Sequence, residues 1–190
     1  MEKIKKIKTP LSNEVIQDLK AGDNVRITGY IYTGRDAAHK RLTDLLKEGK
    51  KLPIEIKGQI IYYVGPAPTP PGYKCGSAGP TTSYRMDPYT PTLLDLGLKG
   101  MIGKGLRSKE VIESMKKNGA IYFAAIGGVA AMIAKSIKSS EVVAYEDLGP
   151  EAIYKYYVED FPVIVCIDAK ENNLYESEPP KYTNPSSPNF

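Results

Sequence analysis

Three cationic side chains stand beside flexible backbone in this chain: Arg35 in TGRD, Arg85 in TTSYRMD and Lys104 in GMIGKG. A guanidinium group can bind a carboxylate through two hydrogen bonds, and an ammonium group adds a movable point charge. Because all three cations lie in loops or at predicted element junctions, the set suits a small dianion. The alternative is that each is a surface cation or a member of a structural ion pair.

Hydroxyl groups gather in the segment KCGSAGPTTSYRMD at 74–87. Thr81, Thr82 and Ser83 can cap the short helix that is predicted after them. Alternatively, one hydroxyl donates to a bound ligand, or takes part in proton transfer if neighbouring cations depress its pKa.

Two further residue types in this region invite a chemical interpretation. His39 is the only histidine and lies four residues after Arg35, so on a helix both point to one face. It is either a structural residue or one that orients Arg35 or the ligand.

Cys75 could act as a nucleophile, because thiolates are stabilised near positive charge. Since no histidine is close in sequence to activate it, we favour a small loop residue.

The cysteine content argues against a metal centre held by this chain alone. Cys75 and Cys166 are the only cysteines, whereas zinc and iron–sulfur sites need three or four soft or imidazole ligands. We therefore predict no metal ligands. Gly127 and Gly128 suggest a phosphate-binding turn, but without the full GxGxxG spacing, and GMIGKG lacks the Ser or Thr of a P-loop.

The composition is that of a soluble globular protein, with 42% hydrophobic and 25% charged residues. The net charge of +4 is small and spread out, which does not indicate nucleic-acid binding. The longest apolar run, at 120–134, is short for a membrane span and contains a Gly-Gly pair. The basic N-terminus lacks the apolar region of a secretory signal, so we expect a cytoplasmic protein with no membrane contact.

The elements that must position these residues alternate between strands and helices. Strands are predicted at 25–32, 59–65, 98–103, 120–127, 140–147 and 161–168, and helices from Ser12 and at 33–50, 90–97, 109–119, 128–137 and 151–160. This order predicts an α/β layered domain at 1–175, followed by an irregular tail at 176–190. Arg35 falls at a strand-to-helix junction, and the long loop at 65–82 is of the kind that is often functional.

Four stretches together resemble a known family: TGRDAAHKRL, KCGSAGPTTSYRMDPYT, LGLKGMIGKG and AIGGVAA. In this order and spacing they are similar to the β subunit, or C-terminal domain, of iron–sulfur-dependent (class I) fumarate hydratases and the related tartrate dehydratases. The resemblance covers residues 9 to 170. It implies a swivelling ββα-type fold, in which a strand-rich core or small barrel carries helices.

The resemblance also implies a function. The chain would be one subunit of a hydro-lyase that interconverts malate and fumarate at a [4Fe–4S] cluster. In that family the cluster is held by the other subunit or domain, so we expect an α subunit as partner, in an α2β2 assembly.

Individual site roles follow from the matched motifs. Arg35, Arg85 and Lys104 match the family's substrate-carboxylate contacts, and Thr81 matches the threonine proposed as base. Thr82 and the backbone at Gly79 match the surroundings of that threonine, and His39 falls within the GRDAAH signature.

Three alternatives remain open. The first is the β subunit of L(+)-tartrate dehydratase, which shares the motifs. The second is a stand-alone anion-binding module without catalysis. The third is a structural partner that only stabilises the α subunit.

Overall fold

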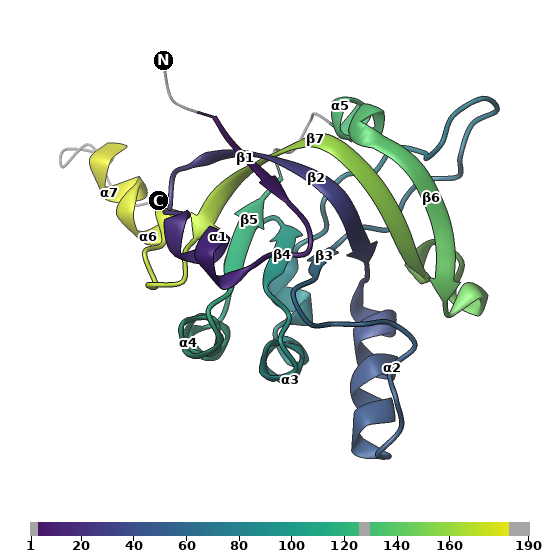
Figure 1. Ribbon diagram of the computed structural model, residues 1–190, viewed down its shortest axis with the longest axis horizontal. Helices are drawn as coiled ribbons and strands as arrows, with labels where there is room; N and C mark the ends of the chain where they lie inside the picture. Colours follow the sequence, from purple (N-terminus) through teal and green to yellow (C-terminus); the bar gives the residue numbers. More distant parts are fainter. Residues whose placement is uncertain (1–3, 126–129, 183–190) are drawn as a thin grey trace, which may run out of the picture.

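The computed structural model describes residues 4–125 and 130–182 of the chain (Figure 1). The elements are β1 (Lys5–Lys8), α1 (Asn13–Asp18), β2 (Asn24–Thr33), α2 (Asp36–Lys47), β3 (Ile60–Tyr62), the 3-10 helix η1 (Ser83–Met86), α3 (Thr90–Asp95), β4 (Gly100–Gly103), α4 (Lys109–Asn118), β5 (Ile121–Ala124), α5 (Ala130–Ser136), β6 (Ile137–Ala144), the 3-10 helix η2 (Glu146–Glu151), β7 (Ile153–Ile167), α6 (Leu174–Ser177) and α7 (Pro179–Tyr182).

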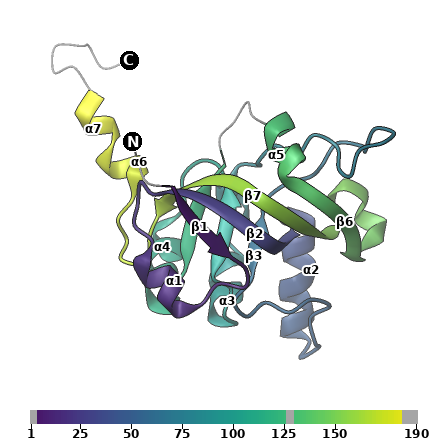
Figure 2. The ribbon, with the colours of Figure 1, turned by 45° about the horizontal axis from the view of Figure 1, so that its top comes forward.

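Five strands close into a barrel in the order β2, β3, β4, β5 and β7. The first four run parallel to one another. Strand β7 is antiparallel and closes the barrel by pairing with both β5 and β2. Strands β1 and β6 extend the sheet outside the barrel, beside β2 and β7 (Figures 1 and 2). The expected α/β fold with a small barrel and flanking helices is therefore confirmed.

Successive residues of the parallel strands face two different cores. Ile60 and Tyr62 belong to the cluster inside the barrel, whereas Ile61 and Tyr63 belong to the cluster outside it. Apolar residues of α2, α3 and α4 complete the outer cluster, and Figure 1 shows these three helices together on one side of the barrel. Side chains fill the small barrel, so its interior offers no room for a ligand.

The capping residues predicted at the helix ends are confirmed at several helices. Ser12 caps α1 by accepting a hydrogen bond from the backbone N–H of Val15. Ser108 caps α4 in the same way, and Gly119 ends that helix in the left-handed conformation. Arg35 is the residue immediately before α2. These signals are local, so neighbouring residues are enough to reveal them.

One predicted helix is wrong. Within the segment at 151–160, Glu151 ends η2. From Ile153 onward the segment forms the start of β7, which continues to Ile167 as one strand of 15 residues. Its tyrosine, valine and isoleucine content favours a strand, and both of its edges are paired, with β2 on one side and β6 on the other. Tyr156 and Val158 alternate into the barrel with Phe161 and Val163. This long-range pairing overrides the helix-like spacing.

Two other stretches differ from the expectation. The basic segment Lys5–Lys8, for which no element was predicted, pairs in parallel with β2 as β1. Where an irregular tail was expected from Glu176, α6 and α7 extend to Tyr182. Residues 183–190 and the Gly127–Gly128 pair lie outside the described residues.

Candidate active site

The carboxyl ends of the parallel strands bring the predicted site segments together. Strand β2 leads into Gly34 and Arg35, and its residue Thr33 lies level with Tyr62 of β3. The N–H of Gly34 donates to the carbonyl of Tyr62, with 3.0 Å between nitrogen and oxygen. Beside them, β4 leads into Lys104. In sheets of this kind, the carboxyl edge of parallel strands is the usual place for a ligand site.

The long loop returns to this same edge and places both threonines there. The N–H of Thr81 donates to the carbonyl of Tyr63 at 2.7 Å, and the carbonyl of Thr81 accepts from the N–H of Lys104 at 3.3 Å. Ser83 N–H then donates to the Lys104 carbonyl at 2.9 Å, so Thr82 pairs with Lys104 as a short parallel bridge. Thr81, Thr82 and Lys104 are therefore immediate neighbours.

The hydroxyl groups of this loop do not share one role. Thr82 precedes η1, but its side chain makes no capping hydrogen bond, so the capping interpretation is wrong for this residue. Ser83 is buried and its hydroxyl lies 2.9 Å from the phenol oxygen of Tyr122. Thr81 is partly buried, whereas Thr82 is exposed. The two threonines thus remain next to an open surface while Ser83 serves the packing.

Both predicted arginines lie at the start of α2. The Arg35 guanidinium lies 3.4 Å from a carboxylate oxygen of Glu151. Arg85, on η1, forms an ion pair and hydrogen bond with Asp36 in the first turn of α2. Arg35 is about three-quarters buried and Arg85 about half exposed. The structure therefore places Arg35 and Arg85 around one helix end, each held by a carboxylate.

These carboxylates were not predicted as part of the site. Asp36 directly follows Arg35 in the GRDAAH motif, so the sequence alone could have identified it as a carboxylate next to the site. Glu151 also accepts from the backbone N–H of Ala37 at 3.4 Å. Glu151 could not have been found from the sequence, because it begins the segment that was predicted as a helix and it reaches α2 only through the β6–β7 connection.

A buried ion pair behind the site was also missed. The Arg107 Nε donates to Asp87 Oδ1 at 2.7 Å, and the guanidinium also donates to the Thr90 hydroxyl at 2.9 Å. It lies over the rings of Tyr63 and Tyr122. Asp87 ends the YRMD motif, so this pair fixes the chain just after Arg85. The YRMD motif includes Asp87, but nothing local in the sequence identifies its partner Arg107, which is 20 residues away.

His39 is placed beneath the site rather than on its surface. Its side chain is fully buried, and Nδ1 lies 2.9 Å from the carbonyl oxygen of Arg35. Burial lowers the pKa of His39 from 6.5 to about 4, with the nearby Arg107 charge acting in the same direction. At neutral pH the imidazole is uncharged and contacts Arg35, not open solvent.

Other residues of the long loop make contacts that hold the loop in place. The Ala78 carbonyl, just before the partly buried Gly79, accepts a hydrogen bond from the phenol of Tyr62 at 2.5 Å. A Cβ on Gly76 would lie 2.0 Å from the Ala67 carbonyl oxygen, so only glycine fits there. These contacts hold the loop that ends at Thr81 against the barrel.

The cysteines are poorly suited to nucleophilic or ligand roles. Cys75 is buried and its thiol donates to the phenol of Tyr156 at 3.4 Å. Burial raises the pKa of Cys75, and it raises the pKa of Cys166 to about 11. Both thiols therefore stay protonated at neutral pH, whereas the thiolate is the reactive and metal-binding form. This supports the interpretation of Cys75 as a loop residue.

Within residues 4–125 and 130–182, no three or more His, Cys, Asp or Glu side chains form a group that could hold a metal ion. Among the helices described there, none has the length and apolar character needed to cross a membrane.

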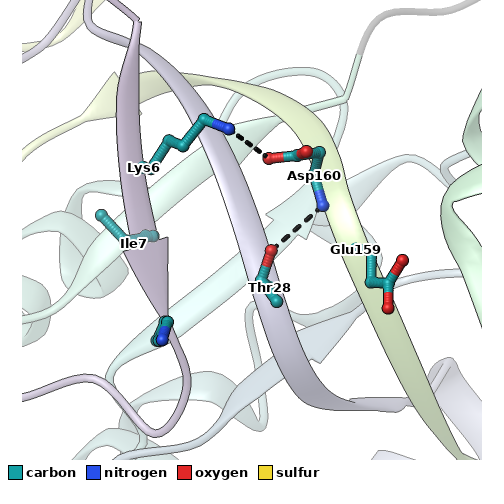
Figure 3. Close-up of a pocket in the computed structure, with 6 residues that line it drawn as sticks. Lys6, Ile7, Thr28, Glu159 and Asp160 are labelled. Carbon is teal, nitrogen blue, oxygen red and sulfur yellow. Dashed lines mark hydrogen bonds and ion pairs between the residues drawn. The ribbon is translucent and has the colours of Figure 1, made fainter.

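The cavities described for the molecule lie elsewhere. The cavity in Figure 3 has a volume of about 330 Å³ and lies where β1, β2 and β7 meet, with Lys6 3.3 Å from Asp160. A larger cavity, of about 550 Å³, lies between the loop around Tyr73 and the start of β6. None of the cavities described is lined by Arg35, Thr81 or Lys104. Of the predicted site residues, Thr82, Arg85 and Lys104 are exposed at the strand ends, whereas Arg35 and Thr81 are partly buried.

Comparison with known proteins gives the class of this chain. Residues 2–178 match the family model described as Fumarase C-terminus, so the chain belongs to that family.

Individual relatives narrow the comparison. Over 152 residues, or 79% of this chain, it is 49% identical to the anaerobic class I fumarate hydratase of Escherichia coli, of which the match covers 28%. It is 41% identical to fumarate hydratase 2 of Leishmania major over 89% of the chain and 30% of that protein. It is 38% identical to the putative L(+)-tartrate dehydratase subunit beta of Methanocaldococcus jannaschii, with 87% of this chain and 88% of that protein covered. The chain therefore spans less than a third of these two fumarate hydratases but most of the β subunit.

Proposed function

We propose that this chain is the β subunit of a hydro-lyase that interconverts malate and fumarate. The observation that carries the proposal is the meeting of the Arg35, Thr81–Arg85 and Lys104 segments at the carboxyl ends of β2, β3 and β4. The family membership and the fumarate hydratase relatives support it.

In this proposal, Arg35, Arg85 and Lys104 bind the substrate carboxylates. Addition of water to a double bond between two carboxylates develops negative charge toward an aci-carboxylate. Fixed cations stabilise that charge more strongly than they stabilise the ground state. The carboxylates of Asp36 and Glu151 hold the two guanidinium groups near one helix end before substrate arrives, which reduces the ordering needed on binding.

Thr81 is proposed as the base at the substrate carbon, with Thr82 and the Gly79 backbone beside it. A threonine hydroxyl is a poor base by itself, so the role requires neighbouring positive charge. The backbone hydrogen bond between Thr81 and Lys104 supports this assignment, because it sets the threonine next to a cationic residue.

The proposal includes a partner. The described residues of this chain do not fit an iron–sulfur cluster, since both thiols are buried and protonated. We propose that an α subunit holds a [4Fe–4S] cluster and completes the site in an α2β2 enzyme. The open surface at Thr82, Arg85 and Lys104, and the greater length of the fumarate hydratase relatives, support this arrangement.

A second candidate function is that of the tartrate dehydratase β subunit. It is favoured by the relative of that name, which this chain matches over 88% of its length. The two substrates are both small dicarboxylates, so the same three cations would serve either one.

The test is reconstitution of the chain with an iron-loaded α partner. We expect the isolated chain to be colourless and inactive, and the mixture to turn over malate and fumarate. Both tartrate enantiomers are assayed in parallel, and turnover of tartrate alone would replace the fumarase assignment by tartrate dehydratase. Ligand binding by the isolated chain, together with an inactive mixture, would favour the non-catalytic anion-binding module.

A further inference from the structure

His39 makes a hydrogen bond of fixed direction to Arg35. It lies one helical turn after Arg35, and its Nδ1 is 2.9 Å from the Arg35 carbonyl oxygen. The backbone N–H of His39 donates to that same oxygen at 2.9 Å. Because a carbonyl oxygen can only accept, Nδ1 must carry the proton. The contact therefore selects one imidazole tautomer.

The ring is also packed tightly under the backbone that precedes α2. A Cβ built on Gly34 would lie 3.3 Å from the His39 Cε1 atom, so the ring fills the space below this residue. Tyr63 meets the imidazole edge-on at 5.3 Å between ring centres, and Tyr89 lies at 6.3 Å. Within the described part of the chain, the buried Nε2 finds no hydrogen-bond partner. The polar contact of the side chain is thus directed at Arg35.

The electrostatic surroundings keep this ring neutral. Burial and the Arg107 charge disfavour the imidazolium form, and they outweigh the Arg35 carbonyl and Asp36, which favour it. Besides Arg107 and Asp36, the titratable side chains next to the ring are Tyr63, which meets it edge-on, and Tyr89, which is tilted against it. A neutral ring at this position supplies a hydrogen bond without adding charge to the site.

We propose that His39 is a positioning residue for Arg35. Its neutral Nδ1–H imidazole fixes the backbone turn from which the Arg35 guanidinium reaches a bound carboxylate. The inference rests on the proposed function in one respect, namely that Arg35 contacts the dicarboxylate. It predicts that the ring controls ligand affinity through Arg35 and takes no part in proton transfer.

The first test is spectroscopic and uses the full chain without a histidine tag. Because the chain contains a single histidine, both imidazole nitrogen resonances in the spectrum belong to His39. We expect ¹⁵N-labelled protein to show the neutral Nδ1–H tautomer at neutral pH. An Nε2–H tautomer, or a charged imidazole, would overturn the inference.

The second test compares three substitutions in the reconstituted enzyme. In His39→Asn the side-chain amide nitrogen replaces Nδ1, whereas His39→Gln places its amide nitrogen near the Nε2 position and His39→Leu has no donor. We expect His39→Gln and His39→Leu to raise KM for malate about tenfold, the effect of one lost hydrogen bond. The value of kcat is expected to change less than threefold, and His39→Asn to restore KM to within about threefold of wild type.

A third measurement separates this inference from the proposed function. Malate is titrated into the same complexes while the Nε–H resonance of Arg35, a buried group without a described partner, is followed. We expect wild type and His39→Asn to bind malate more tightly than His39→Gln and His39→Leu, the same order as for KM. Equal malate affinity in all variants would overturn the positioning role. If the enzyme turns nothing over but the order of malate affinities holds, the hydro-lyase proposal fails and the positioning of Arg35 stands. Should His39→Leu not fold, the comparison of His39→Asn with His39→Gln decides.

Discussion

Replacing Asp87 by alanine tests what holds the YRMD motif in place. Asp87 Oδ1 accepts from Arg107 at 2.7 Å, and Oδ2 accepts from the backbone N–H of Ser108 at 2.5 Å. Both side chains of the ion pair are almost fully buried. The substitution therefore leaves the Arg107 guanidinium inside the protein without its counter-ion.

The expected cost follows from this burial. Removing one partner of a buried ion pair destabilises a protein by about 3 to 5 kcal/mol, because the remaining charge is uncompensated. For a domain of this size, each kcal/mol lowers Tm by about 2 to 4 °C. Asp87→Ala should therefore lower Tm by about 6 to 20 °C, with the site residue Arg85 displaced as η1 loosens.

The free energy of unfolding is measured by equilibrium unfolding in urea and Tm by thermal unfolding, both followed by circular dichroism. Asp95→Ala is the matched control, since Asp95 forms an exposed pair with Lys117 at 3.0 Å and exposed pairs contribute little. The double variant Asp87→Ala with Arg107→Met should recover much of the lost stability, because it removes the unpaired charge as well. If Asp87→Ala cost no more than Asp95→Ala, the structural role of the buried pair would be refuted.

Three further predictions concern the supports of the site. The pKa of His39 is about 4 in the folded protein and 6.5 in the unfolded chain, so its contribution to stability is full above pH 6.5 and is lost as pH falls through 4, by about 3 kcal/mol. Urea unfolding of wild type and His39→Asn across this pH range measures the loss, and parallel pH profiles of the two proteins would contradict the prediction. Tyr122→Phe removes the phenol beside the Ser83 hydroxyl and should cost about 1 to 3 kcal/mol, with an unchanged Tm as the opposing result. Gly76→Ala places a methyl group against the Ala67 carbonyl and should open the loop to proteolysis at least severalfold faster, whereas an unchanged cleavage rate would show that the close approach is not needed.

The segments that form the candidate site could be predicted because their sequence signals are local. The TGRDAAH, GPTTSYRMD and GMIGKG motifs each combine turn-forming residues with a cation. TGRDAAH and GMIGKG lie at the ends of β2 and β4, and GPTTSYRMD ends the long loop that follows β3. That these ends meet at one edge follows from the parallel order of β2, β3 and β4. The predicted strand positions were right there, although β3 ends at Tyr62 rather than at 65.

The features that could not be predicted depend on pairing between distant residues. Barrel closure requires β2 to pair with β7, whose residues lie more than 120 positions later. The same pairing makes residues 153–160 part of β7, and Glu151, just before this strand, lies beside Arg35. Likewise, the ion pair of Asp87 with Arg107 exists only because η1 and the end of β4 are neighbours. Helical spacing in the sequence carries no information on such contacts.

The central claim is that the carboxyl edge of the parallel strands binds the dicarboxylate. The most direct measurement is kcat/KM for malate in the reconstituted enzyme with Arg85→Ala, compared with Arg41→Ala. Arg41, on α2, is a matched control, because like Arg85 it is partly exposed and paired to an aspartate, Asp147, but is not one of the proposed substrate contacts. We predict that Arg85→Ala lowers kcat/KM by about 100- to 1,000-fold, the effect of removing one group that stabilises developing charge, while Arg41→Ala stays near wild type. A loss below threefold for Arg85→Ala, or equal losses for both variants, would contradict the claim and favour a chain that only stabilises its partner.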